Sequence, residues 1–224
     1  MNDPQWTEVD TYLCDLLVPS DSALDAARDA SQAAGLLPIA VAPNQGKLLH
    51  LLARSIGARN ILEIGTLGGY STIWLARALG AGGRLVTLEI DAGHAAVART
   101  NLERARLANI VEVRVGPALE SLAQLASELR GPFDLIFIDA DKPSNTDYFA
   151  WALKLSRTGT VIIVDNVVRS GAVTDPSSSD ANVLGTRRFL EVLAAEPRVS
   201  ATAVQTVGSK GHDGFAIAVV IAEG

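Results

Sequence analysis

A glycine-rich turn directly after a short apolar run constrains this chain most. Residues 60–71 read Asn-Ile-Leu-Glu-Ile-Gly-Thr-Leu-Gly-Gly-Tyr-Ser, and a helical pattern follows from Ser71. An apolar run that stops at glycines and passes into a helix predicts a buried strand, a tight turn and a helix start. Open α/β sheets bind small molecules at such turns, at the carboxyl end of a central strand. The segment therefore predicts an α/β protein with a ligand site at this turn.

The glycine spacing excludes two well-known phosphate-binding loops. A dinucleotide fingerprint starting at Gly65 needs glycines where this chain has Leu67 and Tyr70. A Walker A loop needs Gly-Lys followed by Ser or Thr, which this turn lacks. Glu63 lies in the strand just before the turn, and a buried carboxylate is unfavourable unless it is paired. Two interpretations stay open for Glu63: it binds a cationic ligand group, or it caps its own loop.

Composition narrows the class of protein. The 224 residues are 48% hydrophobic and 20% charged, which predicts one folded domain with a sizeable core. The net charge of −6, without a cluster of Lys and Arg, disfavours a nucleic-acid partner. Cys14 is the only cysteine, so no disulfide forms within the chain, in agreement with a cytoplasmic setting. No apolar run is long enough for a membrane helix.

From residue 60 onward, strand and helix patterns alternate, which predicts a mainly parallel sheet with helices on both faces. Two β-like runs close the chain, and the six residues between them are too few for a helix, so they predict an antiparallel hairpin. We expect a single domain over residues 1–224, with a helical cover over 1–57 and a core over 58–224. Strands are predicted at residues 60–64, 84–89, 110–115, 133–139, 160–165, 199–207 and 214–221.

Apolar stripes predict which helix faces are buried, and a long irregular stretch is expected at residues 167–186. Helices of the cover are predicted at residues 5–17, 22–34 and 45–56. Inward-facing residues of the later helices are predicted to be Ala95, Ala98, Leu102 and Ala105; Leu119, Leu122, Ala126 and Leu129; Tyr148, Trp151, Ala152 and Leu155; and Val183, Thr186, Leu190 and Leu193.

Acidic residues end several predicted strands. Glu89 lies 24 residues after Gly65, close to the spacing at which an acid accepts hydrogen bonds from ribose hydroxyls. The alternative is an acid that simply meets solvent at a strand end. Asp139 follows the fourth strand, and Asp165 and Asn166 end the fifth. Because these strand ends are expected to be neighbours, the three side chains can converge on one point.

Three oxygen donors suit a hard cation such as Mg²⁺, and also Ca²⁺ or Mn²⁺. The absence of His and Cys from the set argues against zinc. The alternative is that Asp165 and Asn166 cap a loop, as such residues often do. Lys142 lies three residues beyond Asp139. A nearby cation would favour its neutral form, which can take a proton from a hydroxyl, whereas the alternative is an ordinary surface lysine.

Taken together, these motifs resemble the cation-dependent O-methyltransferases of the catechol and caffeoyl-coenzyme A type, especially their small bacterial members. The matching runs lie at residues 44–52, 61–71, 86–91, 116–119, 133–142, 161–171 and 213–214. The resemblance implies a Rossmann-like methyltransferase fold with a mostly parallel seven-stranded sheet, an antiparallel C-terminal hairpin and a helical N-terminal segment.

The resemblance also implies ligands. S-adenosylmethionine would be the methyl donor, and a divalent metal, Mg²⁺ or else Ca²⁺ or Mn²⁺, would bind Asp139, Asp165 and Asn166. Lys142 falls on the catalytic lysine position, with Asp139 beside it in the catalytic set. The residues implied to hold the donor are Val41, Glu63, Gly65, Thr66, Ser71, Glu89, Ala118 and Asp141.

The implied activity is methylation of one hydroxyl of a catechol-type small molecule, in bacterial secondary metabolism, by a cytoplasmic homodimer without a nucleic-acid or membrane partner. Two departures concern the pockets: Pro117 stands where many relatives carry Asp, and Ser170 where plant members carry Asn. An alternative is a non-catalytic S-adenosylmethionine-binding protein on the same fold. A nicotinamide-dependent reductase is a third reading, which Leu67 and Tyr70 oppose.

Overall fold

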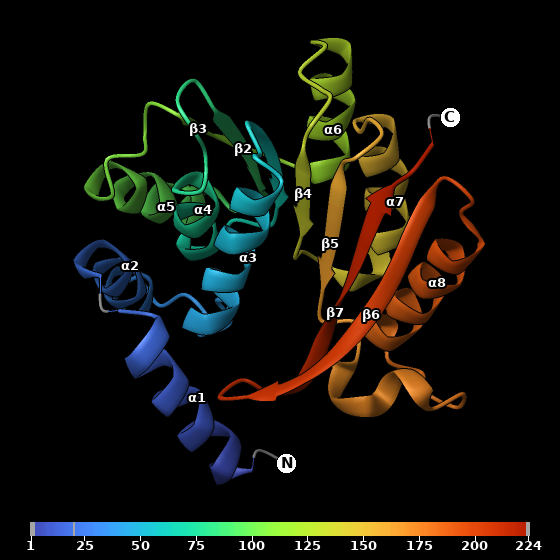
Figure 1. Ribbon diagram of the computed structural model, residues 1–224, viewed down its shortest axis with the longest axis horizontal. Coiled ribbons are helices and arrows are strands. Elements are labelled where there is room, and N and C mark those ends of the chain that lie inside the picture. Colours follow the sequence, from blue (N-terminus) through green and yellow to red (C-terminus); the bar gives the residue numbers. More distant parts are fainter. Residues whose placement is uncertain (1–2, 20, 223–224) are drawn as a thin grey trace. The chain divides into compact units, whose positions relative to one another are not determined.

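The computed structural model describes residues 3–19 and 21–222, and these divide into two compact units. One unit is Asp10–Ser121, and the other is formed by residues 3–9 and 122–222. The seven strands follow the sheet order β3-β2-β1-β4-β5-β7-β6 (Figure 1). This order confirms the predicted α/β fold with a mostly parallel sheet and an antiparallel C-terminal hairpin. The single-domain organisation stays a prediction, and each unit is described by itself.

The unit Asp10–Ser121 contains three parallel strands. In their register Glu63 pairs with Thr87, and Glu89 at the end of β2 pairs with Val115. The strands β1 and β2 have the predicted bounds, because apolar runs flanked by glycine and polar residues mark both ends. The elements are α2 (Ser22–Ala33), α3 (Pro43–Ser55), β1 (Asn60–Ile64), α4 (Tyr70–Ala76), β2 (Arg84–Glu89), α5 (Ala92–Arg104) and β3 (Val111–Val115), with the first turn of α6 (Ala118–Ser127).

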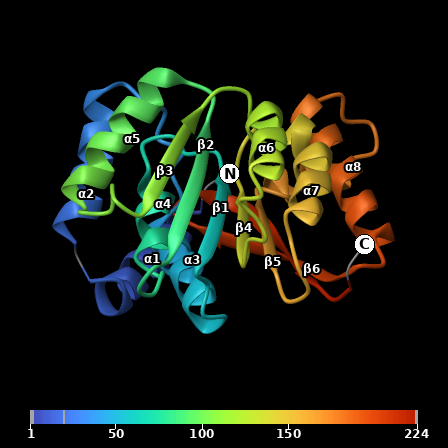
Figure 2. The same cartoon turned by 90° about the horizontal axis from the view of Figure 1, so that it is seen from above.

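Two helices of this unit contact the strands directly, and two further helices pack on those. Helix α4 contacts β1 and β2, and α5 contacts β2 and β3 (Figure 2). Helix α3 packs on α4, while α2 packs on both α4 and α5. The side chains of Ile61, Leu62 and Ile64 are fully buried as a result, as expected for a strand covered on both faces.

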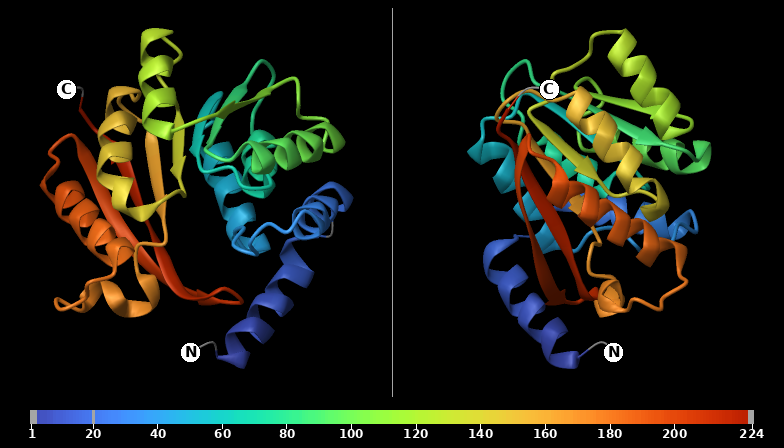
Figure 3. Two further views of the ribbon diagram at one scale, coloured as in Figure 1. Left: turned by 180° about the vertical axis from the view of Figure 1, so that it is seen from behind. Right: turned by 90° about the vertical axis from the view of Figure 1, so that its right-hand side faces the viewer.

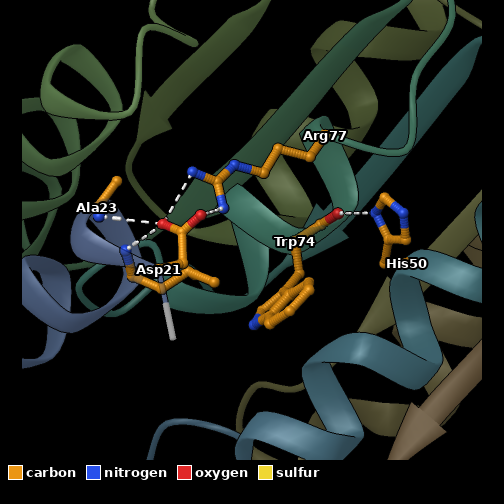
Figure 4. Close-up of polar contacts among 6 residues, drawn as sticks. Asp21, Ala23, His50, Trp74 and Arg77 are labelled. Atoms are coloured by element: carbon orange, nitrogen blue, oxygen red, sulfur yellow. Dashed lines mark hydrogen bonds and ion pairs between the residues drawn. The ribbon is translucent and has the colours of Figure 1, made fainter. Parts of the chain in front are cut away.

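Asp21 joins two of these helices (Figure 4). Its Oδ1 accepts hydrogen bonds from the N–H groups of Ala23 and Leu24, at 3.0 and 3.1 Å, and so caps the start of α2. The guanidinium of Arg77, at the end of α4, donates to both carboxylate oxygens at 2.8 and 3.0 Å. Figure 4 also shows His50 of α3 against the carbonyl oxygen of Trp74, at 3.2 Å. Helices α2 and α3 are thus both tied to α4.

Replacing Asp21 by Ala should lower the free energy of unfolding by about 1–2 kcal/mol, because the cap and a partly exposed ion pair are lost together. Burial raises the pKa of Asp21, but the hydrogen bonds from Arg77 and Leu24 outweigh it and hold that pKa below its ordinary value. The stabilisation is therefore present above about pH 4 and lost as the pH falls through the lowered pKa. Denaturant unfolding at pH 7 and pH 3 measures both effects. Equal stability of Asp21→Ala and the exposed-site control Asp29→Ala at pH 7 would contradict this prediction.

The other unit contains the remaining four strands. Strands β4 and β5 are parallel, while β7 runs antiparallel to both β5 and β6 (Figure 3). Helices α7 and α8 pack together, with Phe149 and Phe189 in edge-to-face contact at 5.7 Å. The elements are β4 (Leu135–Ile138), the 3₁₀ helix η1 (Lys142–Ser144), α7 (Asn145–Lys154), β5 (Val161–Asp165), the 3₁₀ helix η2 (Arg169–Thr174), α8 (Ala181–Ala195), β6 (Val199–Gly208) and β7 (Gly211–Val220).

The structure corrects several sequence-based details. The C-terminal strands are joined by a two-residue turn, Ser209 and Lys210, so His212 and Asp213 lie within β7. Gly211 makes the short turn feasible, since it has a φ of 93°. The irregular stretch ends at residue 180 rather than 186, because α8 begins at Ala181, in agreement with the helix that the stripe from Val183 to Leu193 predicted.

The predicted inward stripe of α6 is partly wrong. Leu129 is 86% exposed because the helix ends at Ser127, and Leu119 is exposed as well. Leu122 is buried as predicted, and Leu125 is buried as well although it lies outside the predicted stripe. In α7 and α8 the predicted stripes are buried except for Trp151 and Leu190, which are half-buried. Phe149 and Phe189 are core residues that these stripes did not include.

Two elements present apolar side chains to solvent. Helix α1 (Pro4–Leu17) has no buried residue, and Tyr12, Leu16 and Leu17 are exposed on it. Strand β6 lies at the end of the sheet order, and Val204 and Val207 are exposed along it. Among residues 3–19 and 21–222, none of the helices has the length and apolar character needed to span a bilayer.

Candidate functional site

The turn after β1 has the backbone geometry that its glycines predict. Gly65 has a φ of 101°, and Gly69, which precedes α4, has a φ of 82°. A Cβ atom on Gly68 would lie 2.0 Å from Oγ of Ser31, so α2 can approach the turn this closely only because residue 68 is glycine. The buried side chain of Asn101 holds the turn from α5, donating from Nδ2 to the carbonyl oxygen of Gly68 at 2.9 Å.

Glu89, at the end of β2, closes this turn. Its Oε2 accepts hydrogen bonds from the N–H groups of Thr66 and Leu67 at 3.2 and 2.7 Å. Its Oε1 accepts from the N–H group of Asp91 at 3.0 Å. Backbone N–H groups therefore fix an almost fully buried carboxylate at the carboxyl end of the sheet, with capacity left for ligand hydroxyls. The ribose role of Glu89 stays a prediction.

Glu63 has polar partners within its own unit. The fully buried carboxylate accepts hydrogen bonds from the hydroxyls of Ser71 and Thr72 in α4 and of Thr87 in β2. These contacts support the interpretation that Glu63 caps its own loop, while a bond from Glu63 to a ligand ammonium stays a prediction. Sequence reasoning missed Thr72 and Thr87. Aligning the first two strands could have found Thr87, because it is the register partner of Glu63.

The other implied donor contacts are distributed over both units. Thr66 is buried, and its hydroxyl lies 2.6 Å from that of Thr87. Val41 is buried just before α3, and Ala118 begins α6. These residues belong to the unit Asp10–Ser121, whereas Asp141 belongs to the other.

Asp141 is engaged at the start of α7. Its two carboxylate oxygens accept hydrogen bonds from Oγ of Ser144 and from the hydroxyl of Tyr148, both at 2.5 Å. Burial raises the pKa of Asp141, but these two hydrogen bonds outweigh it and lower the pKa below its usual range. Burial, followed by the bond to Asp141, raises the pKa of Tyr148. Asp141 is therefore an ionised carboxylate that precedes η1 and has one partner in η1 and one in α7, and its donor role stays a prediction.

The second set of acids lies at the ends of β4 and β5. Ile138 pairs with Val164 in the parallel register, so the next residues, Asp139 and Asp165, follow at the same level of the sheet. Asp165 is only 4% exposed. Lys142 is also buried, and its Nζ donates to Oδ1 of Asp139 at 2.9 Å. The structure thus excludes the surface-lysine alternative and places a buried cation on one of two neighbouring carboxylates.

Asn166 follows with a left-handed backbone, at a φ of 59°, and its N–H donates to Oδ1 of Asp165 at 2.9 Å. In the described part of the chain, no three His, Cys, Asp or Glu side chains are grouped to hold a metal. A cation bound here would therefore depend on two carboxylates and an amide. Such a set is all oxygen and incomplete by itself, which fits a hard cation that keeps waters or substrate oxygens.

These features define the class of protein. A glycine turn after β1, an acid at the end of β2 and an antiparallel β7 between β5 and β6 are together the Rossmann-like arrangement of methyltransferases. Comparison with known proteins agrees. The chain belongs to the O-methyltransferase family, whose sequence model matches residues 19–218. This confirms the predicted fold class and the predicted methyltransferase activity.

Full-length relatives are similar in sequence and structure. The chain is 54% identical to a catechol O-methyltransferase of Niastella koreensis, over 98% of this chain and 100% of that protein. It is 55% identical to one of Mycobacterium tuberculosis, over 97% of both chains. An O-methyltransferase from Bacillus cereus, solved with SAH, superposes with a TM-score of 0.95 at 62% identity, covering 96% of this chain and 98% of that one. TomG from Streptomyces achromogenes is an O-methyltransferase involved in tomaymycin synthesis and was solved with SAM. It superposes with a TM-score of 0.95 at 53% identity, covering 99% of this chain and 100% of that one.

Proposed function

We propose that this chain transfers the methyl group of S-adenosylmethionine to one hydroxyl of a small catechol, with a divalent cation, Mg²⁺ or else Ca²⁺ or Mn²⁺. The observation that carries the proposal is the level placement of Asp139 and Asp165, with the buried Lys142 bonded to Asp139. The names of the Niastella koreensis and Mycobacterium tuberculosis relatives support the acceptor class. The involvement of TomG in tomaymycin synthesis supports a role in secondary metabolism.

On the donor side, the turn after β1 would hold S-adenosylmethionine. The SAM and SAH complexes of relatives support this assignment. When bound, the donor supplies an electrophilic methyl group on its sulfonium. Glu89 would accept hydrogen bonds from the ribose hydroxyls, because backbone N–H groups already hold its carboxylate in place at the end of β2. The remaining proposed contacts are Val41, Glu63, Gly65, Thr66, Ser71, Ala118 and Asp141.

On the acceptor side, Asp139, Asp165 and Asn166 would hold the cation. When bound, the cation lowers the pKa of the acceptor hydroxyls, which is near 10 for a free phenol, and orients them. Asp165 is almost fully buried, so water screens the electrostatic interactions of its carboxylate only weakly.

Lys142 would act as the general base. In its neutral form, Nζ of Lys142 would take the proton from the acceptor hydroxyl, and Asp139 would orient the side chain through the 2.9 Å hydrogen bond. The same pair weighs against the alternative of a non-catalytic S-adenosylmethionine-binding protein, since a binder has no need of a buried lysine beside two carboxylates.

The chain also presents a surface suited to a second copy. Exposed Tyr12, Leu16 and Leu17 form an apolar part of α1, and burying such side chains favours association. We propose a homodimer on this ground. Light scattering should give twice the chain mass of 23.5 kDa, and Leu16→Glu should give the single mass.

Methyl transfer to a panel of catechols, with Mg²⁺ and with EDTA, tests the proposed activity. We expect product with vicinal diols and not with resorcinol, because only adjacent hydroxyls can chelate one cation. EDTA should lower the rate at least about a hundredfold. Undiminished rates in EDTA would refute the metal assignment alone. Binding of S-adenosylmethionine without transfer to any acceptor would favour the non-catalytic alternative.

A further inference from the structure

The segment that follows β5 has an unusual backbone. Asn166, Arg169 and Ser170 have φ values of 59°, 55° and 56°, and Gly171 follows at 86°. Side chains other than glycine rarely adopt this left-handed conformation, which persists only where surrounding groups hold it. The first of these residues, Asn166, belongs to the proposed metal site. The conformation of the segment therefore bears directly on that site.

One carboxylate oxygen holds this segment in place. Oδ1 of Asp213, in β7, accepts hydrogen bonds from the N–H groups of Val168, Arg169 and Gly214, each at 3.0 Å. The N–H group of Val167 donates to the carbonyl oxygen of Gly214, also at 3.0 Å. Three consecutive residues after Asn166 are thus anchored to two consecutive residues of the C-terminal hairpin.

Gly214 allows the segment to approach the hairpin closely. A Cβ atom at this position would lie 2.3 Å from the carbonyl oxygen of Val204 and 2.8 Å from Cγ2 of Val168. Such distances are too short for real contacts, so a larger residue would displace either the β6 backbone or the segment itself. Asp213 therefore accepts several backbone hydrogen bonds, and the absence of a side chain at Gly214 leaves room for the segment that donates them.

We propose that Asp213 is a positioning residue for the metal site. By fixing residues 168 and 169, next to the bond between Val167 and Gly214, it holds Asn166 in its left-handed conformation and so sets the direction in which the Asn166 side chain leaves the backbone. Residues around metal ligands that fix their orientation influence metal affinity strongly. This inference rests on the proposed function, because it takes Asn166 as a metal ligand.

A second role for Asp213 would predict a different dependence on its charge. If Asp213 acted through its negative charge on the methyl acceptor or on the cation, Asp213→Asn would abolish that effect. A carboxylate that acts as a backbone acceptor would be largely replaced by Asn, which keeps an Oδ1 in the same place. Asp213→Ala removes the acceptor in both cases, so the two variants together separate positioning from charge.

The experiment titrates Mn²⁺ into the wild-type protein, Asp213→Ala and Asp213→Asn by calorimetry, with S-adenosylmethionine binding measured in parallel. We expect Asp213→Ala to weaken Mn²⁺ binding about 10–100-fold and Asp213→Asn by no more than about threefold. Binding of S-adenosylmethionine should stay unchanged in both. Gly214→Ala serves as a second test should Asp213→Ala fail to fold, and it should weaken Mn²⁺ binding in the same way.

Three results would overturn the inference. Wild-type affinity for Mn²⁺ in the folded Asp213→Ala variant would show that the anchor does not position the site. Equal loss in Asp213→Asn and Asp213→Ala would assign the effect to charge. Absence of Mn²⁺ binding in the wild-type protein would refute the metal assignment of the proposed function as well, so the two failures are distinguishable.

Discussion

Asp165→Ala should lower kcat/KM for methyl transfer to a catechol by about a thousandfold, the largest effect that we expect from one substitution. Asp165 is almost fully buried at the end of β5, level with Asp139, and no other carboxylate of this strand end can replace it. The remaining Asp139 is already bonded to Lys142, so the site would keep one ion pair and lose its excess negative charge. Calorimetry with Mn²⁺ should show the loss of binding directly.

The control for this prediction is Asp147→Ala, which removes an exposed acid from α7 and should leave activity unchanged. Binding of S-adenosylmethionine to Asp165→Ala should also be unchanged, since Asp165 is not among the proposed donor contacts. If Asp165→Ala retained more than a tenth of the wild-type activity, Asp165 would not be a ligand of a catalytic cation.

Gly185→Ala should lower kcat about 10–100-fold through a change in the position of Lys142. Gly185 lies in the second turn of α8, where a Cβ atom would be 2.5 Å from the carbonyl oxygen of Lys142 and 2.6 Å from Cα of Pro143. Both atoms belong to the backbone and cannot turn aside as a side chain would. The added methyl group must therefore displace η1, and with it the hydrogen bond between Nζ of Lys142 and Asp139.

Two measurements separate this displacement from general damage. Overpacking by one methyl group costs about 1–3 kcal/mol, so the variant should remain folded at 25 °C with a lower melting temperature. The KM for S-adenosylmethionine should change much less than kcat, because most of the proposed donor contacts lie in the unit Asp10–Ser121 and do not touch η1. Gly80→Ala is the matched control, since a Cβ atom there meets no other atom within 4 Å. A wild-type kcat in Gly185→Ala would contradict the prediction, because it would show that the added methyl group does not displace Lys142.

The sequence predicted the strand bounds and the strand-end acids well for a local reason. Each of β1 and β2 is an apolar run bounded by glycine or polar residues, so both ends are marked in the residues themselves. The end of α6 was harder to predict from the sequence, because Leu129 continues the apolar stripe after the helix has ended. Only packing shows that Leu125 is the buried position.

The side-chain partners could not be predicted, because they depend on register and turn length. Thr87 reaches Glu63 only through the alignment of β1 with β2. Asp213 lies within β7 only because the hairpin turn has two residues where the glycines at 208 and 211 predicted a longer loop. The close approach of α8 to Lys142 is likewise a tertiary contact, and a glycine at position 185 is its sole trace in the sequence.

The three hydroxyls around Glu63 have a consequence for turnover. The proposed ligand partner of Glu63 is the ammonium group of the methyl donor, which leaves the site when the product is released. If the buried acid relied on that ammonium for its stability, the turn would weaken at each product release and reform with each new donor. Ser71, Thr72 and Thr87 instead solvate the acid from within the protein. We therefore expect the turn to keep its shape through the proposed cycle, so that exchange of product for fresh donor requires no refolding of the turn.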